Sequence, residues 1–189
     1  LGKTLQILAM LAHQSALGHS DPSLLVVPAS LLGNWRTEAR KFAPGLRLLF
    51  YHPSEISKKE MQGIQSSPEE TLNGYHLVVT TYALASRTAW LKDYHWQFVI
   101  LDEAQAIKNH AAKQTRAVKK IPAKARIALT GTPIENRLGD LWSLFDFLNP
   151  GLLGSSKKFQ SFVNSLEKDG IRSFGPLRKL VSPYILRRL

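Results

Sequence analysis

Short apolar runs recur along the chain, and longer segments with helical periodicity separate them. The runs are rich in leucine and β-branched residues and cover 24–27, 46–51, 76–81, 98–101 and 126–130. They are apolar at successive positions instead of alternating with polar residues, so they predict strands that are buried on both faces, as in parallel sheets.

The segments between these runs predict helices. Their expected ranges are 3–17, 31–42, 58–66, 82–93, 110–120 and 137–148, with Pro and Gly between several of them. Alternating strands and helices predict an α/β fold, a mostly parallel sheet with helices on both faces. From 151 onward no strand run occurs, so we expect a domain over 1–150 and a helical C-terminal extension over 151–189.

Length and composition narrow the class of protein. The chain has 189 residues, of which 44% are hydrophobic, which suffices for one domain with a sizeable core. Its longest apolar run, 24–32, is interrupted by Pro28 and Ser30 and is far shorter than the roughly 20 residues of a membrane-spanning helix. No cysteine is present, so no disulfide partner is expected. These features predict a soluble intracellular protein without a membrane partner, in the cytoplasm or nucleoid of a prokaryote or the nucleus of a eukaryote. Because the first residue is not Met, we also expect a piece of a longer protein.

Charge points to a polyanionic partner. The formal net charge is +11, and residues 104–134 contain no acidic side chain. That stretch carries Lys108, Lys113, Arg116, Lys119, Lys120, Lys124 and Arg126, and the acid-free end of the chain carries Arg172, Arg178, Lys179, Arg187 and Arg188. Helical spacing places Lys113, Arg116 and Lys120 on one face, which favours contacts with nucleic-acid phosphates. A solvated helix face and a frayed tail are the alternative interpretation.

Two of the predicted strands run directly into polar residues. The run at 98–101 is followed by Asp102-Glu103-Ala104-Gln105, and the run at 126–130 leads into Thr130-Gly131-Thr132-Pro133. Carboxylates at the tip of a buried strand are costly unless a cation or a proton transfer uses them. We assign Asp102 to Mg²⁺ and Glu103 to a water that attacks a γ-phosphate.

The tripeptide Gly2-Lys3-Thr4 matches the end of a phosphate-binding loop of the form GxxxxGK[ST]. Each motif has a simpler explanation: a chance tripeptide, a helix cap at Asp102, or a plain turn in which Gly131 supplies a positive φ. The order of the motifs favours the joint interpretation, because carboxyl ends of parallel strands meet at one edge of the sheet. Together they predict a nucleotide site.

The motifs as a set resemble those of a known family. The sequences GKT, VVPASLLGNW, VVTTYAL, ILDEAQAIKN and ALTGTPIENRLGDLWSLFDFLNPG, in this order, are similar to the N-terminal RecA-like lobe of Swi/Snf-type helicase-like ATPases of superfamily two. The resemblance covers nearly the whole chain. It implies a P-loop NTPase fold and a DNA-stimulated ATPase that moves on duplex DNA and remodels protein–DNA complexes.

The resemblance also implies residue roles. Gly2 and Lys3 would bind the ATP phosphates, Thr4 and Asp102 would hold Mg²⁺, and Glu103 would act on the water. Gln105, together with Thr130, Gly131 and Thr132, would couple the nucleotide to the DNA surface. The family often has His where Gln105 stands, and Gln can donate a hydrogen bond but cannot carry a proton.

Candidate DNA contacts follow two other strands. Ser30 can hold a phosphate at a helix start, although it is also a good helix cap, and Thr80 and Thr81 have the same two interpretations. The aromatic residues Trp35, Trp142 and Phe145 are assigned to packing in preference to base stacking. The six histidines show no metal-ligand spacing, so only Mg²⁺ is expected.

Two rival functions stay open. One is the lobe of an RNA or single-strand helicase, and the other is a nucleic-acid-binding scaffold that does not hydrolyse ATP. The family resemblance further implies a second RecA-like lobe as partner, which would supply an arginine finger. This chain alone is therefore expected to fold but to bind ATP weakly and hydrolyse it negligibly.

Overall fold

The computed structural model describes residues 2–19, 21–131, 138–168 and 175–186. A five-stranded parallel sheet with the order β2-β3-β1-β4-β5 forms its centre. The strands are β1 (Ser23–Val27), β2 (Leu48–Phe50), β3 (Leu77–Thr81), β4 (Trp96–Leu101) and β5 (Ala123–Ala128). The predicted α/β fold with a parallel sheet is confirmed.

Burial differs between central and edge strands. Every residue of β1 and β3 is buried, as expected for strands covered on both faces. β5 lies at the edge of the sheet, and none of its residues is fully buried. The expectation that 126–130 forms a buried strand was therefore wrong: the strand begins and ends earlier, and Thr130 lies beyond it.

Ten helices are assigned within the described residues. They are α1 (Lys3–Ala16), α2 (Leu32–Phe42), α3 (Lys58–Ser66), α4 (Pro68–Thr71), α5 (Tyr82–Arg87), α6 (Trp90–Asp93), α7 (Lys113–Lys119), α8 (Leu138–Leu148), α9 (Ser156–Lys168) and α10 (Gly175–Val181). Three short 3₁₀ turns, η1 (Ala29–Leu31), η2 (Ala104–Ile107) and η3 (Ser182–Tyr184), complete the description. The helix predicted over 82–93 is divided, because Thr88 adopts an extended conformation with ψ of 117° between α5 and α6.

Helices cover both faces of the sheet, and the alternating side chains of the strands form two apolar clusters. On one face α1 and α2 pack on Leu25, Val27 and Ile100. On the other face α5 and α7 pack against each other, and their buried side chains join Leu24 and Leu101.

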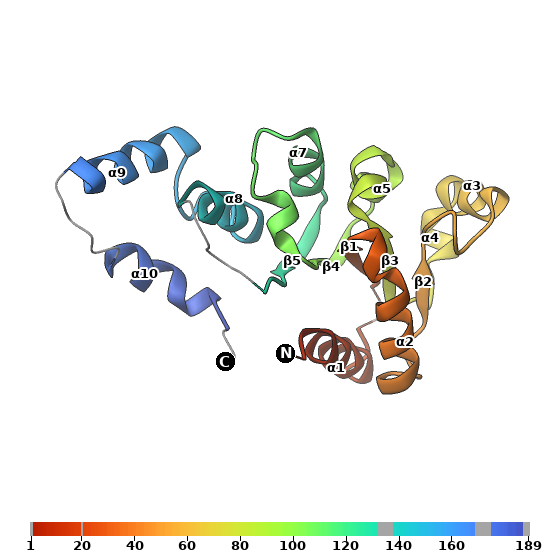
Figure 1. Ribbon diagram of the computed structural model, residues 1–189. Coiled ribbons are helices and arrows are strands. Elements are labelled where there is room, and N and C mark those ends of the chain that lie inside the picture. The colour runs from red at the N-terminus through yellow and green to blue at the C-terminus, as the bar shows by residue number, and fades with distance from the viewer. Residues whose placement is uncertain (1, 20, 132–137, 169–174, 187–189) are drawn as a thin grey trace.

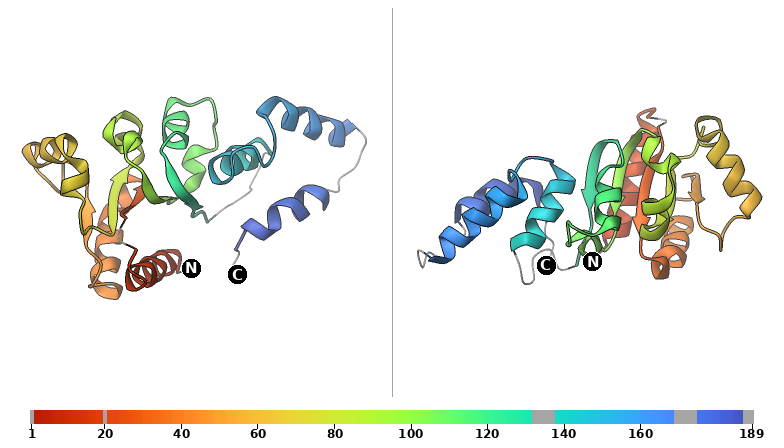
Figure 2. Two further views of the ribbon diagram at one scale, coloured as in Figure 1. Left: turned by 180° about the vertical axis from the view of Figure 1, so that it is seen from behind. Right: turned by 90° about the horizontal axis from the view of Figure 1, so that it is seen from above.

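A third apolar cluster lies outside the sheet. It joins residues of α8, α9 and α10, with Phe145 and Phe159 among its buried members. Figure 2 shows these helices as an arm that continues from the β5 side of the sheet. Helix α8 belongs to this arm although it lies before residue 150, where the sequence predicts the end of the domain. The division at residue 150 stays a prediction. In the described ranges, no helix combines the length and the apolar character needed to cross a membrane.

Candidate functional site

The candidate site lies where β4 ends, at the carboxyl edge of the sheet. Asp102 follows β4 directly, and its amide donates to the carbonyl of Val26 at 2.9 Å, which extends the pairing with β1. Asp102 as a whole is only 6% exposed. Its Oδ1 accepts from the backbone N–H of Glu103 and its Oδ2 accepts from the indole N–H of Trp35, each at 2.9 Å. The orientation of this carboxylate is therefore fixed.

Glu103 has an unusual backbone. With φ of 48° and ψ of 54° it is left-handed, and no other non-glycine residue in the described part of the chain has a positive φ. Such a conformation is unfavourable for a side chain with a Cβ, and strained residues of this kind cluster at active sites and ligand clamps. This left-handed residue turns the backbone away from the direction of β4, and η2 begins at the next residue, Ala104.

A continuous series of polar contacts links the three motifs. The Lys3 ammonium lies 3.8 Å from Glu103 Oε1, and Gln105 Nε2 donates to Glu103 Oε2 at 2.5 Å. The hydroxyl of Thr130 then donates to Gln105 Oε1 at 3.1 Å. The structure thus brings together Lys3, Asp102, Glu103, Gln105 and Thr130, as the order of motifs predicts. Both members of the ion pair are about one-third exposed, at 33% and 35%, so water screens the pair and it is weak.

A helix N-terminus adjoins this series. Gly2 precedes α1 with φ of 75° and ψ of 15°, a conformation that glycine adopts without strain. A Cβ at this position would meet no atom within 4 Å, so conformation and not space favours glycine. The first turn of α1 contains no acidic residue, and its free N–H groups suit an anion.

The oxygen atoms of Asp102 and Thr4 are of the kind that suits a hard cation. Each Asp102 oxygen accepts one hydrogen bond and keeps a further lone pair, and Thr4 presents a partly buried hydroxyl in the first turn of α1. Hard oxygen ligands of this kind suit Mg²⁺, which takes its remaining ligands from waters and phosphates. Within the described ranges no group of three or more His, Cys, Asp or Glu side chains could hold a metal, so nucleotide oxygens would be needed to complete the shell.

The candidate DNA contacts differ in accessibility. Ser30 is exposed within η1, and its side chain caps no helix, so its hydroxyl is available to a phosphate. Thr80 is fully buried, and its hydroxyl donates to the carbonyl of Tyr51 at 3.0 Å. Thr81 is 5% exposed, and its hydroxyl accepts from the amide of Leu84 as the cap of α5. The prediction was thus wrong for the Thr80 side chain, because an inward-facing hydroxyl cannot reach DNA.

The basic stretch divides into surface and structural residues. Lys113, Arg116 and Lys120 are all exposed, while Thr115 and Val118 of the same helix are buried. The three cations therefore share the outer face of α7 and its end, as their spacing predicts.

Two other cations of the stretch have structural partners. Lys119 pairs with Asp146 of α8 at 2.9 Å and lies over the Trp142 ring at 4.9 Å, and desolvation lowers its pKa. Arg126 donates to three backbone carbonyls. The prediction that the whole stretch from Lys108 to Arg126 serves DNA was too broad, because these two residues join α7 and β5 to α8.

The turn after β5 is described only in part. Gly131 is not among the glycines with a positive φ, so the plain-turn interpretation that assigned it one was wrong. Thr132, Arg172, Arg187 and Arg188 lie outside the described residues, and so does the Pro133 end of the motif. Their predicted roles stay predictions.

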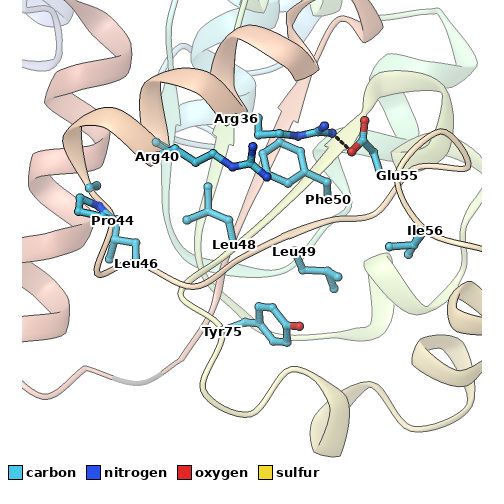
Figure 3. A pocket seen from close by; sticks show the side chains of 12 residues that line it. Arg36, Arg40, Pro44, Leu46, Leu48, Leu49, Phe50, Glu55, Ile56 and Tyr75 are labelled. Carbon is cyan, nitrogen blue, oxygen red and sulfur yellow. Dashed lines mark ion pairs between the residues drawn. The ribbon is translucent and has the colours of Figure 1, made fainter.

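A groove of about 620 Å³ lies elsewhere, on the outer side of β2. Figure 3 shows Arg36 and Arg40 of α2 reaching across it near Phe50, with Arg36 paired to Glu55 and Tyr75 on the opposite side. No predicted site residue lines the groove. It has neither the carboxylates nor the helix N-terminus of the Asp102 site, which we therefore favour for the nucleotide.

Sequence reasoning missed two residues of the site. Trp35 was assigned to packing, and it is 2% exposed, but its indole N–H also holds Asp102. The buried Tyr82 hydroxyl donates to the carbonyl oxygen of Asp102 at 2.8 Å. Neither bond has a sequence signal, because each depends on how a helix is rotated against the sheet. Trp142 and Phe145 are packing residues, as predicted.

Comparison with known proteins identifies the family. The model of the SNF2-related domain matches residues 1–189. The chain is 40% identical to the putative ATP-dependent helicase/translocase YwqA of Bacillus subtilis and 31% identical to the ATP-dependent DNA helicase DDM1 of Arabidopsis thaliana. Each match includes the whole chain but only 20% and 26% of the respective relative, so the chain spans about a fifth to a quarter of their lengths.

A solved structure agrees with this result. The Sulfolobus solfataricus SWI2/SNF2 ATPase core in complex with dsDNA is 43% identical and superimposes with a TM-score of 0.86. The match covers all of this chain and 38% of that one. The resemblance found in the motifs is confirmed, and the RecA-like fold with it. The chain belongs to the SNF2-related domain family.

Proposed function

We propose that this chain is the ATP-binding lobe of a DNA-stimulated ATPase that moves on duplex DNA and remodels protein–DNA complexes. The polar series from Lys3 through Glu103 and Gln105 to Thr130 carries the proposal, because it connects the phosphate-binding helix to the turn after β5. The similarity to an ATPase core solved with dsDNA supports duplex DNA as the activator.

The geometry supports the following residue roles. Gly2 and the N-terminus of α1 bind phosphate, and Lys3 leaves its weak pair with Glu103 to contact the same group. Thr4 and Asp102 would hold Mg²⁺, which when bound would neutralise charge on the phosphates. Glu103, freed from Lys3, orients the attacking water and accepts its proton. A second RecA-like lobe of the same protein is the proposed source of the arginine finger.

ATP hydrolysis by the full-length protein tests this function. We expect turnover to require Mg²⁺ and to rise with duplex DNA more than with single-stranded DNA or RNA. Stimulation by RNA or single strands alone would favour the helicase alternative. Nucleic-acid binding without any hydrolysis would favour the non-hydrolysing scaffold.

The outer face of α7 makes a separate prediction about DNA affinity. Changing Lys113, Arg116 and Lys120 to Gln should flatten the dependence of log K on log[salt] by about 0.9 for each phosphate that the variant no longer neutralises. The effect should be the same for different DNA sequences, because phosphate contacts carry no sequence information. Fluorescence anisotropy with a labelled duplex at several salt concentrations measures the slope.

Lys124 supplies the matched control. Lys124 lies at the start of β5, the opposite end of the strand from the candidate site. Its side chain is 65% exposed and pairs with Asp21. Lys124→Gln should leave the slope unchanged. If the triple variant also leaves the slope unchanged, the α7 cations are a solvated surface with no role in DNA binding.

A further inference from the structure

Asp102 is held by donors from two distant parts of the chain. The Trp35 indole N–H donates to the Asp102 carboxylate, although the two residues are 67 positions apart in the sequence. The Tyr82 hydroxyl donates to the backbone carbonyl of Asp102, from which it is 20 positions apart. Both aromatic rings are nearly inaccessible to solvent, at 2% and 5% exposure.

Each donor follows a candidate DNA-contacting residue. Trp35 lies in the first turn of α2, which begins directly after the 3₁₀ turn that contains Ser30. Tyr82 follows Thr81 and opens α5. The strands that lead into these connections, β1 and β3, are neighbours with Val27 opposite Thr81. Both connections therefore leave the same edge of the sheet on which Asp102 lies.

We infer that Trp35 and Tyr82 are positioning residues that fix the metal-binding Asp102 from the two connections that carry the predicted DNA contacts Ser30 and Thr81. This inference rests on the proposed function, since it assigns the means by which the DNA surface acts on the nucleotide site. A DNA phosphate at Ser30 that moves or rigidifies the start of α2 acts directly on the indole N–H of Trp35. The carboxylate then gains or loses its orientation with DNA binding.

The same chain of contacts explains why the donors are aromatic. A rigid ring transmits a displacement of its helix to its polar atom, because an indole or phenol has only two side-chain torsions. A long flexible donor such as lysine would absorb the displacement through its rotamers. Partners that hydrogen-bond a ligating carboxylate typically change metal affinity or activity by about 10–100-fold when removed.

The decisive variant is Trp35→Phe in the full-length protein. It removes the N–H and keeps an aromatic ring in the core. We measure the Mg²⁺ concentration that gives half-maximal binding of a fluorescent non-hydrolysable ATP analogue, and we expect it to rise by about 10-fold or more. Tyr82→Phe, which removes only a bond to the backbone, should shift it in the same direction by less.

Trp96→Phe is the matched control. Trp96 is fully buried in β4, and its indole N–H donates to the carbonyl of Leu91 at 2.9 Å, at the amino end of the strand. This variant has the same reduction in ring size and removes the same kind of hydrogen bond. It should lower stability like Trp35→Phe but leave the Mg²⁺ dependence of binding unchanged.

A second measurement addresses coupling to DNA. The ratio of ATPase rates with and without duplex DNA should fall in Trp35→Phe, whereas DNA affinity should stay near wild type because no phosphate contact is removed. If Trp35→Phe and Trp96→Phe show equal Mg²⁺ dependence and equal DNA stimulation, Trp35 is only a packing residue and the inference is wrong.

The outcomes separate this inference from the proposed function. Wild-type protein that binds the analogue independently of Mg²⁺, or is not stimulated by DNA, contradicts the proposed function itself. If the wild-type protein behaves as expected but Trp35→Phe and Trp96→Phe give the same results as each other, only the inference is contradicted. If circular dichroism shows Trp35→Phe to be unfolded, 3-benzothienylalanine at position 35 decides, because it replaces the N–H by sulfur and keeps the bicyclic shape.

Discussion

Replacing Glu103 by Gln in the full-length protein is expected to abolish ATP hydrolysis while ATP binding stays close to wild type. The amide has the shape of the carboxylate but cannot accept a proton, and loss of a general base lowers turnover by about 10²–10⁴-fold. Phosphate binding is assigned to Lys3 and the start of α1, so it does not need the Glu103 charge. Lys3 is also released from its weak ion pair, which favours its contact with phosphate.

Single-turnover hydrolysis and equilibrium binding of labelled ATP measure the two effects separately. Glu70→Gln is the control, since Glu70 is an exposed residue of α4, away from the carboxyl end of β4. Near-normal turnover by Glu103→Gln would mean that another group activates the water. A parallel loss of binding and turnover would mean that Glu103 shapes the nucleotide site, for which its left-handed backbone would be the cause.

The sheet was predictable because its central strands carry an unambiguous pattern. β1 and β3 are apolar at successive positions and are buried at every residue. The bounds of the edge strand β5 were harder to predict, because an apolar run does not reveal which strands lack a neighbour on one side. In β5 the residues from Ala123 to Ala128 pair with β4, while the apolar run of the sequence begins only at Arg126 and extends beyond the strand to Thr130.

The site was predictable to the extent that it depends on topology. Residues that follow parallel strands meet at one edge, so Asp102, Glu103 and Thr130 had to lie near each other once the sheet was recognised. Side-chain direction was less accessible. Thr80 shares a face of β3 with Val78, which packs in the core, and this alternation gives the signal that its hydroxyl points inward.

Long-range hydrogen bonds had no sequence signal. The bond from Trp35 to Asp102 requires a particular rotation of α2, and the left-handed backbone of Glu103 occurs at a residue type that seldom adopts it. The three carbonyl acceptors of Arg126 come from three different elements or loops. Sequence reasoning accordingly assigned that arginine by its charge alone.

Replacing Arg126 by Met should therefore destabilise the junction between the sheet and the helical arm. The Arg126 guanidinium donates to the carbonyls of Phe147 at 3.0 Å, Ile121 at 3.1 Å and Lys119 at 3.2 Å, and it lies over the Phe147 ring. A hydrogen bond from a charged donor contributes about 1.5–3 kcal/mol, and partial exposure reduces the sum. We expect local stability to fall by about 2–4 kcal/mol, a value below the simple sum of three such bonds.

Hydrogen–deuterium exchange on the full-length protein measures this loss where it occurs. Peptides covering the end of α7, β5 and α8 should exchange faster by about 30-fold to 1,000-fold, since each 1.4 kcal/mol is a factor of ten when opening limits exchange. Arg126→Lys should lose most of the same protection, because an ammonium cannot reproduce the planar fork of the guanidinium. Lys124→Met changes a residue of the same strand and breaks only its exposed ion pair with Asp21. This variant should change protection little.

The same variants decide whether Arg126 acts in folding or in DNA binding. A structural arginine leaves the salt dependence of DNA affinity unchanged at temperatures where the junction is closed, even though exchange is faster. A DNA-contacting arginine gives the opposite pair of results, a flatter salt dependence by about 0.9 and unchanged exchange. Because its guanidinium is directed at backbone carbonyls of the protein, we expect the first pair, and the second would return Arg126 to the DNA-binding surface.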